Sequence, residues 1–283
     1  MWIFKKIVDL QHYLQQQREV GASIGFAPTM GALHAGHLSL FEVSRKQNQV
    51  TVCSIFVNPT QFNDPKDLEK YPRPIENDID MLTAAGCDVL FLPDVSEIYP
   101  QGTTAWACPF DFGSLAKVME GAHRPGHFEG MVHVVQRLLD IVRPDRLYMG
   151  QKDFQQQTIV QSMLRQECSD IVLIRCPIVR ERDGLAMSSR NVRLSADDRL
   201  LAPMIYKTLL AAKQDKIAGF SPIETQARAI KALTLTPDFS IDYVEIVDST
   251  TLQTIEKWGD SKETVLCTTV RLGGIRLLDN IIL

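Results

Sequence analysis

The chain has 283 residues, of which 45% are hydrophobic and 23% charged, with 16 glycines and 14 prolines. This length predicts one large α/β unit or a main domain with an appendage, and the composition excludes collagen-like, low-complexity and largely disordered proteins. Thirty lysines and arginines against 34 aspartates and glutamates give a formal charge of −4. The chain therefore has no overall excess of positive charge, which would have indicated nucleic acid or an anionic membrane as a partner.

The six cysteines are scattered, and no two of them lie closer than eight residues. This spacing excludes a CxxC motif and predicts reduced thiols rather than a disulfide framework. The apolar start of the chain has no small-residue cleavage site behind it, and nowhere do about 18 apolar residues follow one another. We expect a soluble, cytoplasmic protein with no membrane partner.

Short β-rich apolar runs alternate with amphipathic stretches in the first half of the chain, which is typical of βαβ units. The expected strands are residues 23–26, 50–57, 88–92, 146–149 and 171–176. The expected helices, with apolar residues at three- and four-residue spacing, are residues 38–46, 75–85, 131–142 and 154–167. The sequence predicts an α/β fold with a Rossmann-like, doubly wound parallel sheet.

The pattern changes near Pro177, where the last expected strand ends and a charged turn precedes two helical stretches. Alternating residues over 239–248, a second run over 264–271 and an apolar terminus then predict a few antiparallel strands. We therefore expect two domains. Residues 1–177 form a Rossmann-like domain, and residues 178–283 form a smaller C-terminal α+β domain.

The stretch APTMGALHAGHL directly follows the first expected strand and leads into the first expected helix. In an open α/β sheet, ligands bind at this junction of a strand's carboxyl end with a helix's amino end. Gly31 and Gly36 let a phosphate approach the backbone, and His34 and His37 can both face it. A triphosphate fits this description. Incidental surface histidines and a metal pair are the alternatives, although no third metal ligand is obvious.

The stretch MSSRN, residues 187–191, places two hydroxyls and a guanidinium together in a polar loop. Such a group suits negative charge that develops on transferring phosphates. Taken alone it is a weak signal, because serines before a helix are usually caps. Its occurrence with the HAGH sequence in one chain strengthens the interpretation.

The stretch GQKDFQQ, residues 150–156, follows an expected strand and opens a helix. A lysine at a helix start is disfavoured by the macrodipole, which makes Lys152 a candidate phosphate ligand rather than only a solvated side chain. Gln156 and the loop FVNPTQF, residues 56–62, supply neutral amides that can recognise hydroxyls and a carboxylate. Residues 120–130 could be a hinged lid or an ordinary long loop.

The motifs PTMGALHAGH, FVNPTQF, YPRP, RPGHFEG, GQKDFQQ and MSSRN, in this order, resemble the pantothenate synthetases. These pantoate-beta-alanine ligases are members of the HxGH nucleotidyltransferase superfamily, and the resemblance runs over nearly the whole chain. Three departures occur. Asp64 to Asp67 stand where the family usually has a Gly-rich stretch ending in Glu-Asp, Pro74 replaces a common Thr, and Met131 replaces a common Val. They affect the expected loop conformation rather than the expected activity.

The resemblance implies ATP-dependent condensation of (R)-pantoate with β-alanine to pantothenate, a precursor of coenzyme A. A pantoyl adenylate is the implied intermediate, and AMP and pyrophosphate are the other products. The resemblance also implies Mg²⁺ bridging the phosphates, small-molecule partners without nucleic acid or membrane, and a homodimer formed through the N-terminal domain. The protein ligand of Mg²⁺ stays open, with Asp78 as the one carboxylate considered.

The resemblance assigns residues of this chain to the substrates. Gln61 and Gln156 would bind pantoate, and Gln61 would also line the β-alanine position. His37 is the best candidate for protonating the leaving pyrophosphate. The C-terminal domain would act as a lid that carries MSSRN toward the histidines and excludes water from the adenylate. The implied catalytic residues are His34, His37, Lys152, Ser188, Ser189 and Arg190. The implied ATP site comprises Met30, Gly31, Ala32, Leu33, His34, Ala35, Gly36, His37, Gly150, Gln151, Lys152, Asp153, Val179, Met187, Ser188, Ser189 and Arg190.

Three other functions are alternatives. Another HxGH transferase with a phosphorylated acceptor should have a basic acceptor site, whereas Asn58, Gln61 and Gln156 are neutral. A fragment of an aminoacyl-tRNA synthetase is disfavoured by the acidic charge balance and by the lack of room for an anticodon-binding domain. A regulatory nucleotide-binding module without chemistry is disfavoured because every expected phosphate ligand is present.

Overall fold

The computed structural model describes residues 1–62, 68–103 and 106–283, so the divergent loop from Asp64 to Asp67 lies outside the described residues. The chain divides into two compact units. Unit 1 comprises Met1–Phe112, Arg124–Gly150 and Ile159–Cys176, and unit 2 comprises Gly113–His123, Gln151–Thr158 and Pro177–Leu283. The expected domains at 1–177 and 178–283 stay a prediction, and the units differ from them in residues 113–123, 151–158 and 177.

Unit 1 is built on a six-stranded sheet whose paired strands are all parallel. The strands are β1 (Trp2–Phe4), β2 (Ile24–Thr29), β3 (Val50–Ile55), β4 (Val89–Phe91), β5 (Arg146–Gly150) and β6 (Val172–Cys176). Their order is β1-β4-β3-β2-β5-β6. The five expected strands and the doubly wound parallel topology are confirmed. The order reverses between β2 and β5, which is where such sheets bind ligands.

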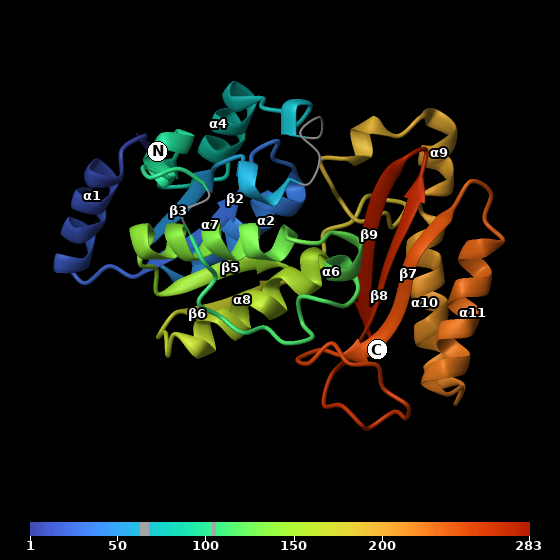
Figure 1. Cartoon of the computed structure of the whole chain (residues 1–283). Coiled ribbons are helices and arrows are strands. Elements are labelled where there is room, and N and C mark those ends of the chain that lie inside the picture. Colours follow the sequence, from blue (N-terminus) through green and yellow to red (C-terminus); the bar gives the residue numbers. More distant parts are fainter. Residues whose placement is uncertain (63–67, 104–105) are drawn as a thin grey trace. The chain divides into compact units, whose positions relative to one another are not determined.

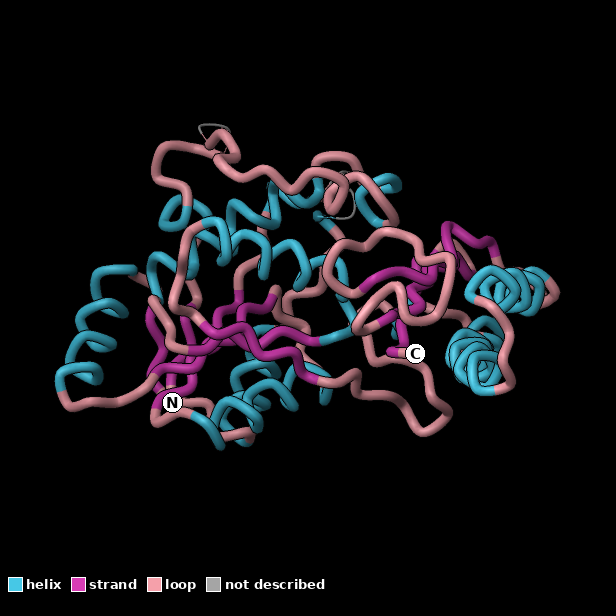
Figure 2. The backbone as a smooth tube through the Cα atoms, turned by 90° about the horizontal axis from the view of Figure 1, so that it is seen from below, coloured by secondary structure: helices cyan, strands magenta, loops and turns pink. Residues whose placement is uncertain are grey.

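Helices lie on both sides of the sheet of unit 1, as Figure 2 shows. They are α1 (Ile7–Glu19), α2 (Ala35–Gln47), α4 (Ile75–Ala84), α5 (Val95–Ile98), α7 (His127–Val142) and α8 (Phe154–Gln166), the last shared between the two units. Helices α2 and α4 bury Phe41 and Leu82 against one face of the sheet, in a core with Cys53 and Leu90. Helix α1 packs against α7. The four helices expected in this half of the chain are present.

Unit 2 contains a three-stranded antiparallel sheet of order β7-β8-β9. Strands β7 (Ser240–Asp248), β8 (Thr264–Leu272) and β9 (Ile275–Ile282) follow the helices α9 (Ala196–Leu201), α10 (Met204–Ile217) and α11 (Pro222–Thr234). Gly273 and Gly274, with φ of +56° and +77°, form the two-residue turn between β8 and β9.

Helices α10 and α11 lie side by side against this sheet (Figure 1). Leu209 and Leu233 from the helices share a core with Ile246 and Leu266 from the strands. The expected α+β character of the C-terminal part is confirmed. None of the described helices has both the length and the apolar character needed to cross a membrane.

Candidate active site

The two histidines of HAGH close the amino end of α2. His34 is the N-cap residue, and its Nδ1 accepts a hydrogen bond from the N–H of Gly36 at 3.1 Å. The N–H of His34 in turn donates to Nδ1 of His37 at 3.3 Å, and the two ring centroids are 4.0 Å apart. Because Nδ1 is the acceptor in both neutral rings, the proton of each resides on Nε2. Both imidazoles are thereby prepared to donate to an oxygen anion.

This geometry bears on the alternative of a metal pair. Metal binding through Nδ1 would compete with backbone N–H groups that already use that atom. Over residues 1–62, 68–103 and 106–283, no three or more His, Cys, Asp or Glu side chains come together as a metal-binding group. The arrangement therefore favours anion binding.

Asp78 holds the loop between β2 and α2. Its Oδ2 accepts from the N–H of Ala32 at 2.9 Å and its Oδ1 from the N–H of Leu33 at 2.8 Å. The side chain is fully buried, and Ala32 has a left-handed φ of +50°. Asp78 was considered above only as a metal ligand, but both its oxygens accept backbone N–H groups. The sequence feature that could have indicated this contact is the four-residue spacing that puts Asp78 on the same helical face as Leu82, which is buried.

The loop after β3 holds Gln61 through Asn58, which is 1% exposed. Nδ2 of Asn58 donates to Oε1 of Gln61 at 3.3 Å, and the Tyr99 hydroxyl donates to Oδ1 of Asn58 at 2.9 Å. Nε2 of Gln61 then lies 2.8 Å from the sulfur of Met30, in the loop between β2 and α2. The structure thus brings together two sequence-predicted segments of unit 1. Tyr99 was not singled out from the sequence.

The start of α7 supports the same loop. The carbonyl of Gln61 accepts a hydrogen bond from Nδ1 of His127 at 3.0 Å, and Nε2 of that ring lies 3.0 Å from Nη1 of Arg124. A Cβ on Gly130 would come within 2.2 Å of the carbonyl oxygen of Thr60, so only glycine permits this approach. Residues 127–130, expected as part of a long loop or lid, are the first turn of α7.

In unit 2, the MSSRN segment ends a short hairpin. The N–H of Met187 donates to the carbonyl of Val179 at 3.0 Å, and Arg180 and Ala186 form a β-bridge. Ser188 accepts from the N–H of Arg190 at 3.2 Å, which makes a local turn rather than a helix cap. The cap of α9 is Ser195 instead. The structure therefore places Val179 beside Met187, and their role in an ATP site stays a prediction.

Lys152 lies in the 3₁₀ turn η2 (Gln151–Asp153), just before α8. Its Nζ is 3.8 Å from Oδ1 of Asp153, and its side chain is 19% exposed. Asn280 on β9 donates to the carbonyls of Gln151 and Lys152. Asn280 was not singled out from the sequence, because its partners are more than a hundred residues away. Gln156, on α8, is half-buried.

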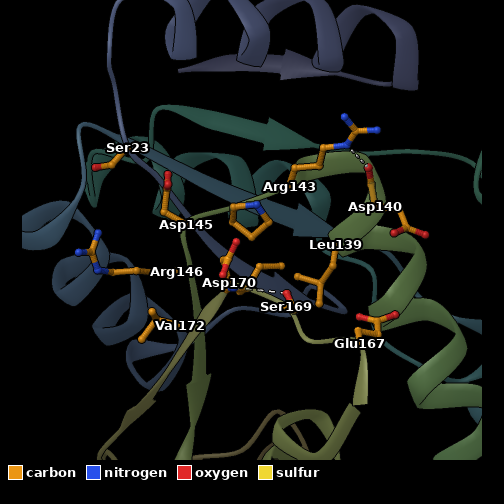
Figure 3. A pocket seen from close by; sticks show the side chains of 12 residues that line it. Ser23, Leu139, Asp140, Arg143, Asp145, Arg146, Glu167, Ser169, Asp170 and Val172 are labelled. Atoms are coloured by element: carbon orange, nitrogen blue, oxygen red, sulfur yellow. Dashed lines mark hydrogen bonds between the residues drawn. The ribbon is translucent and has the colours of Figure 1, made fainter. Parts of the chain in front are cut away.

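A cavity of about 620 Å³ opens in unit 1, lined by residues that include Arg143, Asp145 and Ser169 (Figure 3). Most of its lining residues precede or begin β2, β5 and β6, so it lies at the amino ends of these strands. Asp145 accepts from the N–H of Ile24 at 2.6 Å, and Ser169 from the N–H of Ile171 at 3.3 Å. The loop that leads to His34 and His37 instead follows the carboxyl end of β2. This cavity is therefore not part of the candidate active site.

The model of a protein family described as pantoate-beta-alanine ligase matches residues 2–282. The chain belongs to this family. A pantothenate synthetase from Bacteroides thetaiotaomicron is 48% identical over 281 residues, which cover 99% of this chain and 98% of that protein. One from Porphyromonas gingivalis is 44% identical, with 99% of both chains covered. The family inferred from the motifs is confirmed.

Solved structures of the family share the fold. The pantothenate synthetase of Thermus thermophilus is 40% identical, with a TM-score of 0.91 and 99% of both chains covered. The pantoate-beta-alanine ligase of Francisella tularensis, crystallised with beta-gamma ATP and beta-alanine, is 34% identical with a TM-score of 0.80. That comparison covers 100% of this chain and 97% of the other.

Proposed function

We propose that this chain is an AMP-forming pantoate-beta-alanine ligase, which condenses (R)-pantoate with β-alanine at the expense of ATP. The observation that carries the proposal is the family match over residues 2–282. The paired Nε2–H donors at the start of α2 support it, because they suit a triphosphate. The proposed partners are these small molecules, and the proposed reaction involves neither a nucleic acid nor a membrane.

The first half-reaction joins two anions. A carboxylate oxygen of pantoate attacks the α-phosphorus of ATP, the bond to the β-phosphate oxygen breaks, and pyrophosphate leaves. Their mutual repulsion has to be offset by cations and N–H donors from several directions. We assign this role to His34, His37, Lys152, Ser188, Ser189 and Arg190. His37 is assigned the proton donation to pyrophosphate through Nε2.

The second half-reaction forms the amide. The β-alanine amine attacks the acyl carbon of the pantoyl adenylate, AMP leaves, and the amine loses a proton. Gln61 and Gln156 are assigned to pantoate, and Gln61 also to the β-alanine position. A carboxamide can bind both a hydroxyl and a carboxylate without adding charge. The held orientation of Gln61 supports its assignment, because an oriented amide discriminates against analogues lacking a hydroxyl.

Mg²⁺ is proposed as a companion of ATP. The phosphates supply hard oxygen donors, which this ion prefers, and Mg²⁺ commonly keeps several waters. The oxygens of Asp78 already accept two N–H groups, so this carboxylate is better suited to holding the loop. The bound ion would neutralise phosphate charge, while the protein binds and orients the substrates.

Three broader proposals accompany this function. The resemblance to the family supports a homodimer through the N-terminal domain. The scattered cysteines, predicted as reduced thiols, favour a cytoplasmic location, and the hydrolytic fragility of the adenylate favours a lid role for residues 178–283. Sedimentation velocity tests the first of these directly. A monomer at assay concentration would reject it.

The first experiment is pyrophosphate release from ATP and Mg²⁺ with (R)-pantoate alone, then with β-alanine added. We expect a single-turnover burst with pantoate that becomes steady turnover only with β-alanine. Other carboxylic and amino acids, assayed in parallel, serve as controls for specificity. The absence of pantoate-dependent release, in a protein that binds ATP, would point to another HxGH transferase.

A further inference from the structure

Two consecutive polar side chains on β9, Asp279 and Asn280, are buried, with exposed fractions of 3% and 2%. Burying a carboxylate and a carboxamide is costly unless both are hydrogen-bonded. Their partners lie on two segments that are far away in the sequence, Gln151 and Lys152 on one and Arg180, next to Val179, on the other. One step along a single strand therefore links two segments of the proposed nucleotide site.

Asn280 fixes the backbone around Lys152. Its Nδ2 donates to the carbonyl of Gln151 at 2.9 Å and to that of Lys152 at 3.0 Å. Its Oδ1 accepts from Nε2 of Gln151 at 3.1 Å. The two carbonyls belong to the peptide groups on either side of the Lys152 Cα. Holding both peptide planes sets the direction in which the Lys152 side chain leaves the backbone.

Asp279 fixes the hairpin that leads to MSSRN. Its two carboxylate oxygens accept from Arg180 at 2.6 and 2.9 Å, and Nη1 of Arg180 also donates to the carbonyl of Gly184 at 3.0 Å. The guanidinium carbon lies 3.7 Å from the ring centroid of Tyr206. A planar fork held by a carboxylate and stacked on a ring is a geometry that lysine cannot reproduce.

We propose that Asp279 and Asn280 are the positioning pair of the nucleotide site. Asn280 orients Lys152, and Asp279 acts through Arg180 on the hairpin whose strands carry Val179 and Met187. The inference rests on the proposed function, in which these segments bind ATP. Neither residue is assigned a contact with substrate. Because the two side chains are neighbours on one strand, they hold both segments at a fixed spacing.

The test uses Asn280→Leu, which removes the carboxamide at similar size, and Arg180→Lys, which keeps the charge and loses the fork. Affinity for a non-hydrolysable ATP analogue is measured by calorimetry, together with the KM values of ATP, pantoate and β-alanine. We expect each variant to weaken binding of the analogue and to raise the KM of ATP about tenfold. The KM of β-alanine should stay within about twofold of wild type.

The matched control is Gln226→Met. This carboxamide also donates to a backbone carbonyl of unit 2, that of Val244 at 2.8 Å, but it lies on α11. We expect it to lower the unfolding temperature without changing the affinity for the analogue. An equal loss of affinity in this control would show general destabilisation and overturn the inference.

Lys152→Ala separates the inference from the function on which it rests. If it weakens ATP binding while folded Asn280→Leu and Arg180→Lys bind as wild type, the positioning role is wrong. If Lys152→Ala itself binds normally, the proposed nucleotide site is wrong and the inference falls with it. If the wild-type protein binds ATP but releases no pyrophosphate in response to pantoate, only the proposed substrate is wrong. The comparison of affinities among the variants then still decides the inference.

Discussion

The hydroxyl of Tyr99 donates a hydrogen bond to Oδ1 of Asn58 at 2.9 Å. Asn58 holds the carboxamide of Gln61, so this bond orients a proposed pantoate ligand through one intermediate side chain. Tyr99→Phe should cost about 1 kcal/mol of stability. It should also raise the KM of pantoate several-fold and leave that of ATP unchanged. Steady-state kinetics with each substrate varied in turn check this, and an unchanged KM of pantoate would exclude the orienting role.

The same tyrosine predicts an alkaline effect on stability. Burial raises the pKa of Tyr99 to about 12. Between the ordinary pKa near 10 and this value, the unfolded state loses the phenolic proton and the folded state keeps it. The unfolded state then binds fewer protons, so the free energy of unfolding falls as the pH rises through this window. Denaturant unfolding at a series of pH values should show a shallower fall in Tyr99→Phe than in wild type.

His37→Ala should slow adenylation by about 100-fold or more, because proton donation to pyrophosphate and a phosphate contact are both lost. Loss of the cap interaction at the start of α2 should cost about 1 kcal/mol of stability. Rapid-quench measurement of pantoyl adenylate formation checks the first effect, and thermal unfolding the second. Wild-type adenylation in a folded His37→Ala protein would remove this residue from the mechanism.

Asp78→Asn tests whether this carboxylate serves the loop or the metal. Replacing one oxygen by an amide N–H sets two donors against each other, which should cost about 1–3 kcal/mol of stability. If Asp78 only holds the loop, turnover should fall while the Mg²⁺ concentration for half-maximal rate stays the same. A large rise in that concentration, with stability preserved, would indicate a metal ligand.

The cysteines should differ sharply in reactivity. Cys168 is exposed, whereas Cys53, Cys87, Cys176 and Cys267 are buried. Burial raises the pKa of the Cys87 thiol to about 12 and that of Cys176 to about 11, so little thiolate is present at neutral pH. A thiol reagent should modify Cys168 fastest in the native protein, ahead of the half-buried Cys108. Cys168→Ser should abolish this fastest phase, and its persistence would contradict the structure.

The fold was predictable from the sequence where periodicity is strong. The alternation of apolar runs with amphipathic stretches predicted β2 to β6 and the helices α2, α4, α7 and α8, but not α1 or α5. Strand β1 was missed because it has only three residues, of which Trp2 and Ile3 are exposed, so it carries no burial pattern. The start of α7 was missed because Pro125, Gly126 and Gly130 indicate a loop. Gly130 instead serves the close approach to the Thr60 carbonyl.

The sequence could single out the motif residues as candidates because their chemistry is local in the sequence, and their roles stay a prediction. Val179 and Met187 are indeed backbone neighbours, and Met30 contacts Gln61. The residues that hold them were not predictable. The hydrogen bonds by which Tyr99, Asp279 and Asn280 hold their partners in or beside the site reach residues 41 to 129 positions away. A contact of that kind leaves no periodicity, spacing or cap signature in one sequence.

The paired imidazoles at the start of α2 belong to the helix as much as to the proposed phosphate site. Nδ1 of His34 accepts from the N–H of Gly36, and Nδ1 of His37 accepts from the N–H of His34. Each ring therefore satisfies a backbone donor at a helix end, where such donors have no partner within the helix. A substitution at either position removes a structural bond and a proposed ligand together, so its effects on stability and on activity arise from one side chain.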